Sequence, residues 1–190
     1  MNNKIIQETS YSEAAELLRK GYILAAPTET CFIFAGNGLK NDIISRVLVL
    51  KNRLRVPMGL LVKNISMTEK LADINEKQKV LLSHFWPGPV SFVLTKKKII
   101  PHNLTAGYET VSVRVSPHPF WKNIFELIDF PIIATSANLS QFPESYSSKD
   151  ILEQDFFKKD EFFAVVKEKK YEWSQPSTVV SFLSNTINLV

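Results

Sequence analysis

Apolar positions along the chain form short runs and helical repeats, and the two kinds of segment alternate. Apolar runs that end at turn residues predict strands at 22–26, 58–62, 90–95, 111–115 and 131–135. Helical spacing predicts helices from Ser10 or Ser12 to Arg19, from Asn41 or Asp42 to about Lys51, and over 66–74, 76–85 and 118–128. This alternation predicts an α/β fold with a twisted, mixed sheet and flanking helices.

The last forty residues carry a different pattern. Residues 149–172 are dense in charge and include two Phe-Phe pairs, which favours a solvated helix and an edge strand over a binding tail. The runs 178–182 and 186–190 predict two strands that form a hairpin. No linker or repeat separates this tail from the rest, so we expect a single domain over residues 1–190.

Composition and charge are ordinary for a globular protein, with 45% hydrophobic and 22% charged residues and a net charge of +4. The start of the chain lacks the apolar core of a signal peptide, and no apolar run is long enough to cross a membrane. Cys31 is the only cysteine, which favours a reducing compartment. We therefore expect a cytoplasmic protein with no membrane partner.

Standard cofactor motifs are missing from the sequence. The three histidines show no metal-ligand spacing, and neither of the two common glycine-rich nucleotide loops is present. We expect no resident metal and no prosthetic group.

The segment KNRLR carries Lys51, Arg53 and Arg55 at the end of a predicted helix. Cations at this position complement the helix dipole, which explains them without any ligand. A chain that leaves a helix and becomes extended also points alternate side chains one way, so the three cations are able to converge on one anion. The segment alone leaves both interpretations open.

Three other segments place polar groups where strands begin or end. Thr30 follows a strand in PTET, Ser136 and Asn138 follow one in TSAN, and Ser177 opens the run STVV. These hydroxyls and amides suit a ligand site, but turns and helix caps use the same residues. Arg114 lies inside the apolar strand VSVRV, so it must snorkel, pair with an acid or face a polar cleft.

Taken in order, PTET, K-x-R, WPGP with a following Ser91, VSVRV, SAN-L-S and STVV resemble the YrdC-like family of threonylcarbamoyl-adenylate synthases. The matching motifs extend from Pro27 to Val180, nearly the whole chain. The resemblance implies a YrdC-like fold, in which a twisted sheet surrounds a large, concave, positively charged cleft.

The resemblance also implies an activity. Members of this family form L-threonylcarbamoyl-AMP and pyrophosphate from L-threonine, bicarbonate and ATP, with Mg²⁺ bridging the phosphates. Separate transfer enzymes then pass the threonylcarbamoyl group to an adenosine of tRNA. Some members bind tRNA or double-stranded RNA. The alternative is a divergent, catalytically weak member that keeps the cleft as a nucleotide- or RNA-binding module.

The resemblance implies a role for residues in each of the matching motifs. Positions matching Lys51 and Arg53 are identified with catalysis on the ATP phosphates. The ATP-binding set implied by the resemblance is Arg53, Arg55, Thr110, Ser136 and Asn138. The threonine-binding set is Thr30, Arg114 and Ser177.

The sequence departs from the family pattern mainly on the ATP side. The lysine that usually follows K-x-R falls on Pro57 or Met58, and Arg55 is the candidate replacement cation. Phe32-Ile33 replaces a Tyr-Gly pair after PTET, and no arginine follows the STVV strand in these residues. The count of phosphate-binding cations is therefore the feature that distinguishes the two functions.

Overall fold

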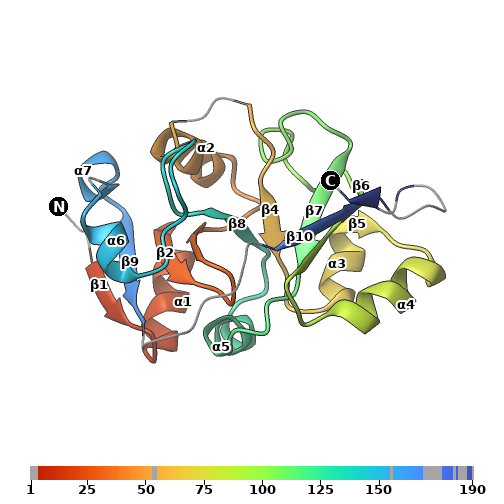
Figure 1. The fold of residues 1–190 in the computed structure, drawn as a ribbon, viewed down its shortest axis with the longest axis horizontal. Coiled ribbons are helices and arrows are strands. Elements are labelled where there is room, and N and C mark those ends of the chain that lie inside the picture. The colour runs from red at the N-terminus through yellow and green to blue at the C-terminus, as the bar shows by residue number, and fades with distance from the viewer. Residues whose placement is uncertain are drawn as a thin grey trace.

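The computed structural model describes residues 4–52, 55–154, 156–168, 177–181, 183 and 188–189. Over these residues eleven strands join into one mixed sheet, in the order β1-β9-β2-β3-β8-β4-β7-β6-β10-β11, with β5 paired to β6 (Figure 1). The strands of the first half of the chain are β1 Lys4–Gln7, β2 Ile23–Pro27, β3 Phe32–Ala35, β4 Gly59–Leu61, β5 Ala72–Asp73 and β6 Val90–Lys96. Those of the second half are β7 Thr110–Arg114, β8 Ile132–Ser136, β9 Phe163–Lys167, β10 Thr178–Ser181 and β11 Asn188–Leu189.

Helices cover both faces of this sheet in its central part. They are α1 Tyr11–Arg19, α2 Asn41–Leu50, α3 Ile65–Leu71, α4 Glu76–Phe85, α5 Pro119–Leu127, α6 Ser148–Leu152 and α7 Phe156–Lys159. In Figure 1, α2 lies on one side of the central strands, and α1 and α5 lie on the other. Among the described residues no helix combines the length and the apolar character needed to cross a membrane.

β2 and β3 are buried along their whole length because helices cover both faces of the sheet at these strands. Ile23 and Ala25 of β2 pack in one core cluster with α2, whereas Leu24 and Ala26 pack in a second cluster with α1 and α5. Successive side chains of a strand point to opposite faces, so a strand covered on both sides reads as one apolar run. The expected mixed α/β sheet with flanking helices is confirmed.

Strand β8 joins the two halves of the sheet. Its residues 132–134 pair antiparallel with β4, and Thr135 and Ser136 pair antiparallel with β3. β4 in turn pairs parallel with β7, which pairs antiparallel with β6. The ends of β3, β4, β7 and β8 therefore come close together.

The WPGP segment fixes the approach of α4 to the sheet. The indole of Trp86 donates to the carbonyl of Val90 at 2.7 Å, and the amide of Gly88 donates to the carbonyl of Val115 at 3.0 Å. A Cβ atom on Gly88 would lie 2.3 Å from the carbonyl oxygen of Phe85, so only glycine fits this turn. The motif thus links the start of β6 to the end of β7.

Two predicted elements need correction. The edge strand expected in the charged segment is β9, which lies between β1 and β2 and is buried from Phe163 to Val166, because the aromatic and aliphatic residues of the segment enter the core. The helix predicted over 66–74 ends at Leu71, because Ala72 and Asp73 pair with β6 and Asn75 then caps α4. The C-terminal hairpin is confirmed by the antiparallel pairing of β10 with β11.

Candidate functional site

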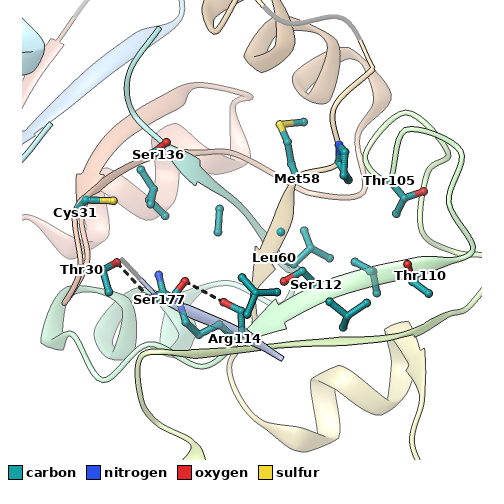
Figure 2. A pocket seen from close by; sticks show the side chains of 18 of the residues that line it. Thr30, Cys31, Met58, Leu60, Thr105, Thr110, Ser112, Arg114, Ser136 and Ser177 are labelled. Atoms are coloured by element: carbon teal, nitrogen blue, oxygen red, sulfur yellow. Dashed lines mark hydrogen bonds between the residues drawn. The ribbon is translucent and has the colours of Figure 1, made fainter. Parts of the chain in front are cut away.

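A cavity of about 530 Å³ opens where the ends of β3, β4, β7 and β8 meet (Figure 2). Its polar lining comes from separate segments of the chain, namely Thr30, Ser91, Thr105, Thr110, Ser112, Arg114, Ser136, Glu144 and Ser177. Five of the predicted site residues are among them, which are Thr30, Thr110, Arg114, Ser136 and Ser177. The fold therefore brings into one cavity the three residues predicted for the threonine side and two of those predicted for the nucleotide side.

Strand β7 runs along this cavity and gives it two ends. Thr110, Ser112 and Arg114 occupy alternate positions of β7 and share one face of the strand (Figure 2). Four residues of extended chain separate Thr110 from Arg114 by about 13 Å. One end of the cavity therefore carries a guanidinium group and the other carries hydroxyl groups.

Arg114 is buried, with 5% of its surface exposed. Its Nη1 lies 2.6 Å from Oε1 of Glu29 and 3.3 Å from the hydroxyl oxygen of Thr30. Burial lowers the pKa of the Arg114 guanidinium from its ordinary value, and the Glu29 carboxylate opposes that change. The side chain of Ser116 donates to the other oxygen of Glu29. Of the three environments predicted for Arg114, the structure shows two, because the side chain pairs with an acid and also lines the cavity.

The hydroxyl groups of PTET shape the turn between β2 and β3. The hydroxyl of Thr28 donates to the carbonyl of Cys31 at 2.8 Å and accepts from the amides of Thr30 and Cys31. It also lies 2.9 Å from the hydroxyl of Thr30. This closed turn presents the Thr30 side chain to the cavity and to Arg114.

Cys31 also lines the cavity, beside Thr30. Burial raises the pKa of its thiol to about 11. The thiolate is the nucleophilic form of cysteine, so a raised pKa argues against covalent catalysis at this residue. The thiol is buried in the structure.

Lys51 is buried and faces the loop that follows β8. Its ammonium donates to the carbonyl of Ser136, to the carbonyl of Asn138 at 3.2 Å and to Oδ1 of Asn138 at 2.9 Å. The hydroxyl of Ser136 donates to Oδ1 of Asn138 at 2.7 Å. Lys51 and Asn138 therefore hold the shape of this loop, and Ser136 is the member that reaches the cavity.

The structure describes two of the three cations of KNRLR, Lys51 and Arg55. Lys51 is enclosed by the loop after β8, whereas Arg55 is exposed and has a φ of 65°. Among the described residues, the cavity lining includes neither of them, although Pro57 and Met58 belong to it. Arg53 lies outside the described residues. The roles assigned to these three cations stay predictions.

Ser177 enters the site through the pairing of β10 with β6. β10 runs parallel to β6, with Val179 opposite Ser91, and the hydroxyls of Ser91 and Ser177 lie 3.3 Å apart (Figure 2). The serine that follows WPGP and the serine of STVV thus meet across two strands.

Several residues of the site carried no role in the sequence analysis, among them Glu29, Ser112 and Glu144. The alternation of polar residues in TVSVR was a signal for Ser112. Glu29 stands between two threonines of a recognised motif, but its partner is 85 positions away. Glu144 has no sequence signal, because a loop contact alone brings it to the cavity.

Comparison with known proteins identifies similar chains. Residues 16–190 match the Sua5/YciO/YrdC family model, whose description reads "Telomere recombination". A threonylcarbamoyl-AMP synthase of Pyrococcus abyssi is 35% identical over 158 residues, which is 82% of this chain and 46% of that protein. One of Psychromonas ingrahamii is 30% identical over 154 residues, or 77% of this chain and 79% of that protein. The chain thus spans about half of the first relative.

Solved structures give the same picture of the fold. Sua5 from P. abyssi in complex with L-threonine has a TM-score of 0.88 and 28% identity, and the match covers 100% of this chain and 56% of that one. YciO from E. coli has a TM-score of 0.83 at 19% identity over 99% of this chain and 93% of that chain, which supports the fold alone.

Proposed function

The chain belongs to the Sua5/YciO/YrdC family, and from that premise we propose that it is a threonylcarbamoyl-AMP synthase. It would form L-threonylcarbamoyl-AMP and pyrophosphate from L-threonine, bicarbonate and ATP. The observation that carries this proposal is the single cavity that collects Thr30, Arg114 and Ser177 at the same strand ends as Thr110 and Ser136. Curated relatives with the same activity in their names add support.

The chemistry needs little from the protein beyond positioning. The amine of threonine and bicarbonate give a carbamate and water, and a carbamate oxygen then attacks the α-phosphorus of ATP. The bond from that phosphorus to the bridging oxygen breaks, and pyrophosphate leaves. A two-ended cavity suits this reaction because it would hold an amino acid and a nucleotide in contact along β7. No side-chain nucleophile takes part, which is consistent with the raised pKa of Cys31.

We assign the threonine carboxylate to Arg114, and the hydroxyl groups of Thr30 and Ser177 to the same substrate. Ser136 and Thr110 would contact the nucleotide. Arg53 and Arg55 are the proposed phosphate-binding cations, and Lys51 would act on the nucleotide through the loop of Ser136 and Asn138. The bonds of Lys51 to that loop support an indirect role.

Mg²⁺ would arrive with ATP, bridge its phosphate oxygens and neutralise part of their charge. Among the described residues no group of three or more His, Cys, Asp or Glu side chains lies together. The phosphates would therefore supply most ligands of the ion.

The wider setting follows from the product. Threonylcarbamoyl-AMP would be consumed by enzymes that modify tRNA, and direct contact with tRNA or double-stranded RNA is a further proposal for this chain. We place the reaction in the cytoplasm and assign it to a single domain, which the continuous sheet supports.

The test is a pyrophosphate-release assay with ATP, bicarbonate and threonine, together with mass detection of the adenylate. Both products are expected only when all three substrates are present. A folded protein that releases no more pyrophosphate with threonine than without it would contradict the proposal. Omission of bicarbonate is the matched control, because it removes the carbamate and leaves the nucleotide site intact.

A further inference from the structure

The cavity contains an acidic group for which the proposed mechanism has no use. Glu144 lines it together with Arg114, and these two are the charged side chains of the described lining. Glu144 is half-buried and follows β8 in the loop that carries Ser136 and Asn138. A carboxylate facing a site for polyphosphate is unfavourable on charge grounds, so its position calls for a cationic partner.

Backbone bonds fix Glu144 beside the PTET turn. The amide of Phe32 donates to the carbonyl of Ser145 at 2.9 Å, and the hydroxyl of Ser145 donates to the carbonyl of Ala137 at 2.7 Å. The residue after Glu144 is thereby tied to Phe32, which follows Cys31 in the chain. Arg114, on β7, and Glu144, in the loop after β8, thus line the same cavity from two segments of the chain.

The two charges are not paired with each other. Arg114 forms its ion pair with Glu29, and among the described residues Glu144 is in no ion pair. The contact of Glu144 that the structure does record is the hydroxyl of Tyr146, which donates to its Oε2 at 3.4 Å. The fields of both groups reach the thiol of Cys31, where Arg114 lowers the pKa and Glu144 raises it. A guanidinium and a carboxylate therefore line the same cavity without forming an ion pair with each other.

We propose that Glu144 binds the ammonium group of the amino-acid substrate while Arg114 binds its carboxylate, so that this end of the cavity selects a zwitterion. The inference rests on the proposed function and names the residue that would recognise the amine. A free α-amino acid carries an ammonium and a carboxylate on the same carbon. It therefore complements a site that presents a carboxylate and a guanidinium. Acylated amino acids and hydroxy acids lack the ammonium and would be discriminated against.

The experiment compares two ligands on three proteins by titration calorimetry, without metal. The ligands are L-threonine and its deaminated analogue, in which a hydroxyl group replaces the ammonium. The proteins are the wild type, Glu144→Gln and Glu161→Gln, where Glu161 is an exposed acid between α7 and β9 that controls for the change in net charge. Each measurement is repeated with a non-hydrolysable ATP analogue present.

Wild type and Glu161→Gln are expected to favour threonine over the analogue. Glu144→Gln is expected to bind threonine about 10-fold or more weakly, since a hydrogen bond to a charged group is lost, and to bind the analogue unchanged. Equal weakening of both ligands would indicate a structural role and overturn the inference. Unchanged threonine affinity would overturn it as well.

This design separates the two proposals. A wild type that prefers the ammonium through Glu144 but forms no adenylate would contradict the synthase function and leave the inference standing. If the wild type forms the adenylate and Glu144→Gln still prefers threonine over the deaminated analogue, the inference is overturned and the synthase function stands. Absence of threonine binding with and without the ATP analogue would overturn both.

Discussion

The two ends of the cavity are built in different ways. At the end of Thr30 and Arg114, the polar groups are already engaged with protein partners on strands and in a closed turn. At the end of Thr110, the described lining consists of hydroxyls and of apolar residues such as Met58, with no cation among them. The first end is pre-organised by the sheet, whereas the described lining of the second carries no charge.

This difference teaches where changes will be tolerated. Strand residues that are paired across the sheet have little freedom to move, so the amino-acid end should keep its geometry without ligand. Connecting segments between elements readily accept insertions and altered charges. One departure from the family pattern falls after α2, between Arg53 and Leu60, whereas Phe32-Ile33 departs from it in β3.

The largest expected effect is at the nucleotide end. Arg53→Ala should lower adenylate formation by about 1,000-fold or more, because phosphate-binding arginines stabilise the charge of the transition state. The melting temperature should change little. The measurement is pyrophosphate release beside thermal unfolding, with Arg55→Ala as the matched variant. If Arg53→Ala unfolds the protein, Arg53 has the structural role of stabilising the helix end. If Arg55→Ala alone abolishes activity, Arg55 is the principal phosphate ligand.

The next effect tests the amino-acid end. Arg114→Met should raise the KM for threonine by about 100-fold, and it should also destabilise the fold by roughly 3 kcal/mol because Glu29 keeps a buried charge without its partner. Urea unfolding and steady-state kinetics measure the two losses. The double variant Glu29→Gln/Arg114→Met should regain stability without regaining activity. Recovery of both would mean that Arg114 does not touch the substrate.

A smaller effect on function is expected at Lys51, which holds the loop that follows β8. Lys51→Met should lower the free energy of unfolding by about 2–4 kcal/mol, since the carbonyls of Ser136 and Asn138 lose a charged donor. At temperatures well below unfolding, the KM for ATP should rise only a few-fold. Chemical unfolding and ATP titration distinguish this from direct phosphate binding, in which stability would hold and ATP affinity would collapse.

The smallest effect concerns Cys31. Its pKa is raised from the ordinary 9.0 to about 11, so the folded state binds the thiol proton more tightly than the unfolded chain. The resulting stabilisation is complete below pH 9 and is lost as the pH rises toward 11. At neutral pH the thiolate fraction falls about 100-fold, and alkylation should slow accordingly. Iodoacetamide labelling of native and urea-unfolded protein tests this; equal rates would contradict it.

Local patterns predicted much of the fold and failed where tertiary contacts compete with them. The helix predicted over 66–74 is too long by three residues at its end, because its local sequence does not indicate that Ala72 and Asp73 pair with β6. The burial of β9 was missed because charged neighbours surround its apolar run. The site followed the same rule. Thr30, Arg114 and Ser177 belong to recognisable motifs, whereas Glu144 reaches the cavity through one backbone bond of its neighbour, Ser145, to Phe32.

By itself the sequence determined the class of fold, the family and several of the residues that line the cavity, because these depend on hydrophobic period and on motifs with fixed local geometry. Only the tertiary structure decided which charges meet. Arg114 with Glu29, Lys51 with Asn138 and the approach of Glu144 to Cys31 all join residues more than 80 positions apart. Such pairings are set by strand order and loop packing, and a linear pattern carries no record of either.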